Sequence, residues 1–191
     1  RGKIVECAVK AHAALRPATL QAGAPPQEPS VSRNRRNLFK DGRVRSIGPV
    51  TRDLPDHRPE DIVENAGPID PDLGLLYVSD PGADRPRAAL SVFALHCNTV
   101  GNTRVGESVV SADYPGAMIR EMRKAFGPEF VNLFGAGTCG DINYVDPRSP
   151  KVRSHEEIGG LLAATAVGAR RTLAGIVGPD LAVRRGVIEL P

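Results

Sequence analysis

The sequence predicts an α/β domain in which helices pack against layers of mixed β-sheet. Strand-like apolar runs alternate with segments of helical periodicity along the 191 residues. Two of the apolar runs, 87–95 and 130–134, end in a polar cluster and a glycine-rich turn. Because open α/β sheets carry their sites at the carboxyl ends of their strands, we expect functional residues at this edge. Hydrophobic residues make up 41% of the chain, which is enough for one core.

Composition and charge argue against several classes of protein. The net charge is only +3, and no basic run is interleaved with aromatic residues, so we expect no nucleic-acid partner. An odd number of cysteines without CxxC spacing (Cys7, Cys97 and Cys139) argues against a disulfide framework and a cysteine zinc knuckle. No apolar run approaches 18 residues, so we expect no transmembrane segment. The chain begins at Arg1, which suggests a piece of a longer protein and leaves its compartment open.

The first third of the chain is expected to be one helix, one short strand and a long loop region. Apolar or small residues recur at helical spacing over 3–16, with His12 on the apolar stripe, and Pro17 should end that helix. A core or helix-end role for His12 is favoured over a metal ligand. Residues 18–22 are expected to form a short strand.

The segment 23–67 is rich in proline and is expected to be mostly loop. Its arginine-rich part, SRNRRNLFKDGR, favours a solvated basic turn closed by Asp41-Gly42. The alternative is a clamp for an anion or carbonyl, because a guanidinium offers several donors in one plane. His57 is expected on an exposed loop.

Two strands, 73–79 and 87–95, should form a hairpin across the turn Asp80-Pro81-Gly82. The second strand is apolar almost throughout, which predicts burial of both its faces. His96 follows it at once. A hydrogen-bonded structural histidine is the commoner role at such a position, but a neutral imidazole held by a stiff strand also suits a zinc ligand.

The next helix should run over 113–126, with Asp113 at its amino end and Gly127-Pro128 beyond its last turn. An N-cap role for Asp113 is favoured over a carboxylate near the site. The strand 130–134 then leads into GAGTCGDIN, whose glycines allow close backbone approach. This loop lacks both common phosphate-binding patterns, and it could instead present N–H groups to an oxyanion. Thr138 and Cys139 are conceivable nucleophiles, although no adjacent base is identifiable from the sequence.

The last helix should begin with a capping box in which Ser154 is the N-cap and Glu157 is at N3. It is expected to run to about residue 173, with two arginines near its carboxyl end and Gly175 after it. His155 is expected at the surface. A final strand is predicted over 181–190.

Five motifs in a fixed order resemble the N-terminal catalytic domain of the neutral/alkaline (non-lysosomal) ceramidase family. They are NRR in the long loop, DPDLGLLYV, the strand ending ALHCN, SADYPG and GAGTCGDIN. The resemblance covers most of the chain, so it implies that residues 1–191 are part of a single such domain. The family's enzymes are zinc amidases that cleave the N-acyl bond of ceramide, and its members are often secreted or periplasmic.

The resemblance also implies site residues. His96 matches the family's metal-binding histidine, and Arg35 matches an arginine that binds substrate and stabilises charge. Asp113 matches an aspartate with a structural or supporting role. The GTCGDIN loop matches the loop beside the zinc, so Gly140 and Asp141 are expected there. Two further residues, Asn34 and Thr138, are candidate substrate contacts.

Two departures from the family pattern bear on the chemistry. The position of the family's proposed nucleophilic serine is occupied by Asn143, which could orient water or substrate. The family's other metal ligands are an upstream histidine and a downstream glutamate and tyrosine, and none has a clear match here.

The sequence-based hypothesis is therefore a Zn²⁺-dependent hydrolase that cleaves an amide or ester bond of a small-molecule or lipid substrate by a metal-activated water. Three alternatives remain: a hydrolase of the same fold for a small ester or sugar amide, a non-catalytic domain that binds lipid or carbohydrate, and a nucleotide-binding protein, which the missing phosphate-loop lysine disfavours. Substrate and oligomeric state are not defined by the sequence.

Overall fold

The computed structural model describes residues 2–47, 58–100, 110–149, 151–178, 182–183 and 185–189. Its centre is a five-stranded sheet with the order β10-β1-β6-β7-β8. The strands are β1 (Thr19–Gly23), β6 (Gly74–Ser79), β7 (Ala88–Phe93), β8 (Val131–Ala136) and β10 (Ala174–Gly175). β7 and β8 are parallel and the other neighbours are antiparallel. The predicted mixed sheet packed with helices is confirmed.

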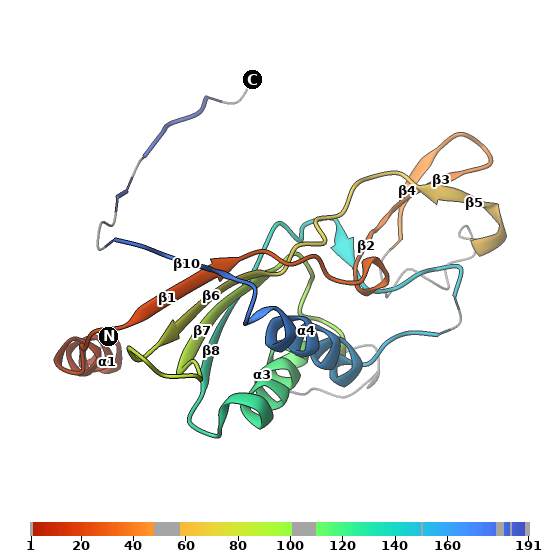
Figure 1. Cartoon of the computed structure of the whole chain (residues 1–191). Coiled ribbons are helices and arrows are strands. Elements are labelled where there is room, and N and C mark those ends of the chain that lie inside the picture. The colour runs from red at the N-terminus through yellow and green to blue at the C-terminus, as the bar shows by residue number, and fades with distance from the viewer. Residues whose placement is uncertain are drawn as a thin grey trace.

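Two helices, α3 (Asp113–Phe126) and α4 (His155–Ala169), lie side by side on one face of the sheet (Figure 1). A parallel pair such as β7 and β8 needs a crossover, and α3 lies within that connection. The helices cross closely at Gly159, where an added Cβ would be 2.5 Å from Ala117 Cβ and 2.7 Å from the carbonyl oxygen of Tyr114. The core between sheet and helices includes Leu75, Tyr77, Phe93, Tyr114, Met118, Met122, Ile158 and Leu162.

The face of the sheet opposite the helices is open. Along β7 the side chains alternate, so that Phe93 is buried while Leu90 and Val92 are 41% and 38% exposed. On β8, Val131 and Leu133 are 48% and 65% exposed. The prediction that both faces of 87–95 are buried is therefore wrong, because the helices cover one face only.

The first helix, α1 (Gly2–Ala13), has no buried residue. Its apolar stripe faces solvent, since Ile4 is 76% exposed and Val9 is 62% exposed. The helix ends earlier than predicted, four residues before Pro17, and His12 lies exposed in its last turn. None of the helices in the described part of the chain is long and apolar enough to cross a membrane.

The segment 23–67, predicted as mostly loop, contains four short strands in its described part. These are β2 (Arg33–Asn34), β3 (Arg36–Phe39), β4 (Val44–Ser46) and β5 (Ile62–Asn65), together with the 3₁₀ turns η1 (Pro29–Val31) and η3 (Pro59–Asp61). β3, β4 and β5 form a small sheet with its own apolar cluster of Phe39, Ile47 and Ile62. The prediction missed this sheet because its strands are too short to show alternation. His57 lies outside the described residues.

β2 joins this region to the centre of the molecule by pairing with β9 (Ile142–Asn143). The small sheet therefore lies beyond the carboxyl ends of β7 and β8, as Figure 1 shows. This arrangement places the arginine-rich segment against the glycine-rich loop that follows β8.

The carboxyl end of the chain also differs from the prediction. Helix α4 begins with the expected capping box, in which the Glu157 N–H donates to Ser154 Oγ (3.2 Å) and the Ser154 N–H donates to Glu157 Oε2 (2.8 Å). It ends at Ala169 rather than near residue 173. The last strand is β10, whereas the described residues of 181–190 form no strand.

Candidate functional site

The carboxyl ends of β7 and β8 lie at one edge of the sheet, as the sequence predicts. Phe93 pairs with Ala136 at the end of the two strands, and the Gly137 N–H then donates to the Phe93 carbonyl oxygen (2.9 Å). A Cβ at Gly137 would be 3.3 Å from the backbone of Phe93 and Ala94. The glycine therefore allows the loop 137–142 to lie directly against the segment that carries His96.

This approach brings together two side chains that are 43 residues apart. His96 Nδ1 lies 3.6 Å from Cys139 Sγ, and both residues are partly exposed. No base beside Cys139 is identifiable from the sequence, because its neighbour His96 comes from another strand end. The next residue, Cys97, is exposed, and its thiol has the Tyr114 hydroxyl as a hydrogen-bond partner.

Three buried groups fix the backbone around His96. The Tyr114 hydroxyl donates to the Leu95 carbonyl oxygen (2.7 Å), and the Tyr144 hydroxyl donates to the Asn98 carbonyl oxygen (3.3 Å). Burial raises the pKa of Tyr114, so its hydroxyl stays a donor. Sequence reasoning assigned no role to either tyrosine, because their partners are backbone groups of a distant segment.

Asp113 is the third of these groups. Its carboxylate accepts from the Thr99 hydroxyl (2.5 Å) and from the Val100 N–H (2.8 Å), and the residue is 6% exposed. The N-cap of α3 is Ala112, so the favoured N-cap role for Asp113 is wrong. Asp113 also has a φ of 51°, an uncommon value outside glycine, so the fold holds it at some conformational cost. Its role is to anchor the segment that follows His96.

Asn34 and Asp141 meet where β2 pairs with β9. Asn34 is 2% exposed, and its Nδ2 donates to Asp141 Oδ2 (2.9 Å) and to the Pro68 carbonyl oxygen (2.9 Å). Its Oδ1 accepts from the Arg36 N–H (3.0 Å). The candidate substrate contact Asn34 therefore lies in the site region, but both ends of its side-chain amide are hydrogen-bonded to protein groups.

The two adjacent arginines of this segment differ sharply. The Arg36 guanidinium pairs with Asp141 Oδ2 at 3.2 Å. The Arg35 side chain is exposed and makes no hydrogen bond or ion pair with any described residue. The Arg35 main chain is nevertheless anchored, because its N–H donates to the Asp141 carbonyl oxygen (2.7 Å). Within the described part of the chain, Arg35 thus presents a guanidinium without a protein partner from a fixed backbone.

The other candidate residues of the loop have different surroundings. Thr138 and Gly140 are exposed. Asn143 is 1% exposed, its Nδ2 donates to the Ile47 carbonyl oxygen (3.3 Å), and its Oδ1 accepts from the Val145 N–H (2.5 Å). Both ends of the Asn143 amide are therefore engaged with backbone groups.

A small cavity of about 270 Å³ opens beside the same edge of the sheet. Its lining includes Ala94 and Gly137, which stand two residues before His96 and Cys139, together with the exposed carboxylates of Asp70 and Asp72. The cavity gives a substrate room to lie next to the strand ends.

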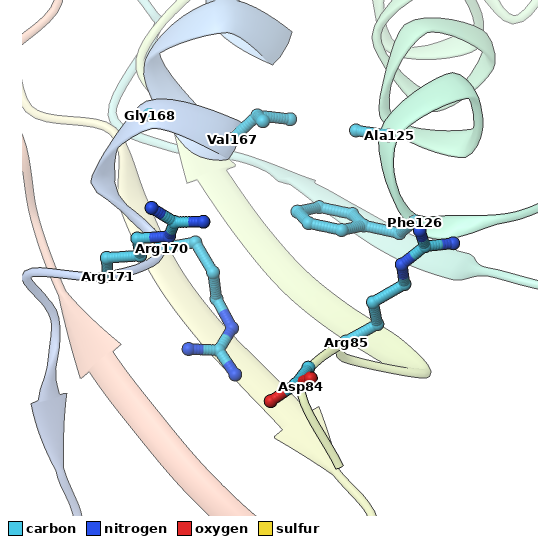
Figure 2. Close-up of a pocket in the computed structure, with 8 residues that line it drawn as sticks. All are labelled: Asp84, Arg85, Ala125, Phe126, Val167, Gly168, Arg170 and Arg171. Atoms are coloured by element: carbon cyan, nitrogen blue, oxygen red, sulfur yellow. The ribbon is translucent and has the colours of Figure 1, made fainter.

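A second cavity, of about 480 Å³, lies elsewhere and contains none of the candidate residues. Figure 2 shows it between the loop carrying Asp84 and Arg85 and the carboxyl ends of α3 and α4. Arg170 lines it, but its guanidinium also lies 5.9 Å from the centre of the Tyr77 ring and 3.5 Å from Ser79 Oγ. Arginines at a helix carboxyl end complement the helix dipole, which explains this cluster without a ligand.

Among the described residues no three His, Cys, Asp or Glu side chains gather closely enough to hold a metal ion. The described residues bring together two such donors at the strand ends, His96 and Cys139. A complete zinc site would need at least one further protein ligand from elsewhere.

The fold is similar to part of the fold of solved neutral ceramidases. No protein-family model matches the sequence, and no curated protein matches it. Among solved structures, the chain is similar to neutral ceramidase from Pseudomonas aeruginosa, with a TM-score of 0.59, 20% identity, and coverage of 92% of this chain and 26% of that chain. It is also similar to a structure described as ceramidase complexed with C2, with a TM-score of 0.59, 21% identity, and coverage of 89% and 25%. The chain spans about a quarter of the length of these enzymes, and the likeness is one of fold.

Proposed function

We propose that this chain is part of a zinc-dependent hydrolase that cleaves an amide (N-acyl) or ester bond, as in the ceramidases whose fold it shares. One observation carries the proposal. The loop 137–142 contacts His96 through Cys139 and binds the Arg35 backbone through Asp141. It therefore links the candidate metal ligand to Arg35, whose guanidinium has no partner among the described residues. A histidine, a cation and a cavity at one sheet edge are the parts that carbonyl hydrolysis needs.

Each residue has a distinct role in this proposal. His96 holds zinc together with ligands outside the described residues. A zinc ion at such a site supplies a water that is acidic enough to act as a nucleophile near neutral pH. Arg35 donates to the carbonyl oxygen of the substrate and stabilises the negative charge that develops there. Asp141 keeps Arg36 and Asn34 in place through an ion pair and a hydrogen bond, so these two side chains are engaged within the protein.

Asn143 supports the choice of water as the nucleophile. Its amide cannot attack a carbonyl as a serine hydroxyl does, and both its ends are engaged with the backbone. We therefore give Asn143 and Asp141 the role of shaping the loop, while Thr138 and Gly140 are exposed at its tip and can contact substrate.

The first experiment measures zinc content and hydrolysis in the full-length protein. We expect about one zinc per chain, a large loss of zinc in His96→Ala, and no loss in the control His12→Ala, whose histidine is exposed on α1. Hydrolysis of N-acyl amides and of short esters should stop on chelation and return with zinc. Equal hydrolysis after complete metal removal would contradict the proposal, as would a well-folded protein that takes up no zinc.

Asn143 also favours a second candidate function, a non-catalytic domain that binds lipid or carbohydrate. Its amide stands in place of the family's proposed nucleophile, and both its ends bind backbone groups. This domain would keep the fold and bind its ligand without turnover. His96→Ala would then leave ligand binding unchanged, whereas the hydrolase proposal expects loss of both zinc and activity. Titration of the His96→Ala and His12→Ala variants with ceramide or a soluble sugar amide distinguishes the non-catalytic domain from the hydrolase.

A further inference from the structure

The contact between His96 and Cys139 has the dimensions of a metal-ligand pair. Zinc bonds to sulfur at about 2.3 Å and to histidine nitrogen at about 2.0–2.1 Å, so a tetrahedral angle places the two donor atoms about 3.5 Å apart. The observed distance between Cys139 Sγ and His96 Nδ1 is 3.6 Å. The two atoms can therefore bind one ion with almost no movement of either side chain.

Both donors stand on backbone that is already fixed. On one side, the hydroxyls of Tyr114 and Tyr144 hold the carbonyl groups of Leu95 and Asn98, which flank His96. On the other side, the Cys139 N–H donates to the Gly137 carbonyl oxygen (2.7 Å), and the Cys139 carbonyl oxygen accepts from the Ile142 N–H (3.0 Å). Preorganised donors bind metal better because little conformational entropy is lost on binding.

We propose that Cys139 is a second metal ligand beside His96, so that this chain supplies a histidine–cysteine pair to the ion. The inference rests on the proposed metal dependence and names a ligand that the resemblance to ceramidases does not supply. A thiolate is a soft ligand, so the pair selects zinc and its soft or borderline neighbours over Mg²⁺ and Ca²⁺.

Both residues are partly exposed, which leaves the outer side of the ion open. A catalytic zinc site typically has three protein ligands and one water. The pair supplies two protein ligands, and no third His, Cys, Asp or Glu side chain of the described residues joins it. The cavity lined by Ala94 and Gly137 lies beside residues that stand two positions before His96 and Cys139 in the chain.

The test uses cobalt in place of zinc in the full-length protein, because sulfur bound to Co²⁺ gives a near-ultraviolet charge-transfer absorption that nitrogen and oxygen ligands lack. The variants are Cys139→Ser and, as the matched control, Cys7→Ser, whose thiol is exposed on α1. Thermal unfolding of the metal-free proteins checks that both fold alike. We expect the absorption in the wild type and in Cys7→Ser, and its loss in Cys139→Ser. We also expect at least about tenfold weaker cobalt binding in Cys139→Ser, since removal of a supporting group alone costs 10–100-fold.

The outcomes separate this inference from the proposed function. Cobalt that binds without the sulfur absorption, or with an unchanged absorption in Cys139→Ser, overturns the role of Cys139 and leaves a metal hydrolase possible on other ligands. A sulfur absorption that depends on Cys139 in a protein without hydrolytic activity supports the pair and contradicts the proposed function. No cobalt binding by the folded protein overturns both.

Discussion

At the scale of single residues, the candidate site is defined by which polar groups already have partners. Asn34, Arg36 and Asp141 bind one another, whereas the Arg35 side chain has no described partner. Two adjacent residues of the same type thus have different tasks. Arg36 ties β3 to the loop after β8, and Arg35 is available to a ligand.

Arg35→Ala and Arg36→Ala should therefore differ in kind. Arg35→Ala should lower kcat/KM by about 100-fold, the effect of losing one donor to a developing oxyanion, with little change in stability. Arg36→Ala removes an ion pair whose members are 54% and 31% exposed, so it should cost about 0–1 kcal/mol in unfolding free energy. Steady-state kinetics and urea unfolding of both variants check this. A larger kinetic loss for Arg36→Ala than for Arg35→Ala would reverse the assignment.

The residues show how far sequence reasoning reached. It predicted that His96, Arg35 and the glycine-rich loop belong to one region, because strand order and motif order are visible in a sequence. It did not predict that Cys139 lies beside His96, or that Asn34 and Asn143 are buried. Those facts depend on partners such as Asp141, which is 107 residues from Asn34. Hydrogen bonds between side chains that are so far apart in the chain leave no local pattern in the sequence.

At the scale of elements, the close packing of α3 against α4 depends on Gly159, because any side chain at this position would meet α3. Adjacent glycines at 159 and 160 look alike in the sequence, but an added Cβ at Gly159 meets Ala117 Cβ at 2.5 Å, whereas at Gly160 it meets nothing within 4 Å. Helical periodicity predicted that both helices exist, although α4 ends at Ala169, before the predicted end near residue 173. Periodicity does not reveal how closely the two backbones approach.

Gly159→Ala and Gly160→Ala should consequently have opposite effects on stability. Gly160→Ala should stabilise the protein by up to about 1 kcal/mol through helix propensity. Gly159→Ala should destabilise it by about 1–3 kcal/mol, because overpacking outweighs the same gain in propensity. Denaturant unfolding measures both changes. Equal stabilisation by the two substitutions would mean that the helices are not in close contact at this point.

At the scale of the whole molecule, the central sheet is covered on one side and open on the other. Leu90, Val92, Val131 and Leu133 form the open face, and β8 is also an edge strand with unpaired backbone groups. Apolar runs in the sequence predicted the strands. How many layers cover the sheet depends instead on helices that are distant from these strands in the sequence. Exposed apolar patches on an edge strand favour association.

The 191-residue chain on its own should therefore self-associate through this face. The double change Leu90→Thr, Leu133→Thr should lower the associated fraction in sedimentation or light scattering while leaving the unfolding free energy within about 0.5 kcal/mol. Val110→Thr is the matched control, since Val110 is 107% exposed and lies away from the sheet. Unchanged association in the double variant would show that another surface is responsible.

The order of pairing in the sheet also bears on how the protein is made. β1 takes β6 as one neighbour, but its other edge pairs with β10, in the register Gln21 with Gly175. Arg33 pairs with Asn143 in the same long-range manner. Because the chain leaves the ribosome from its amino end, β1 has one unpaired edge and the site has no glycine-rich loop until most of these residues have been synthesised. During this interval the edge of β1 that later pairs with β10 is open to pairing with other strands.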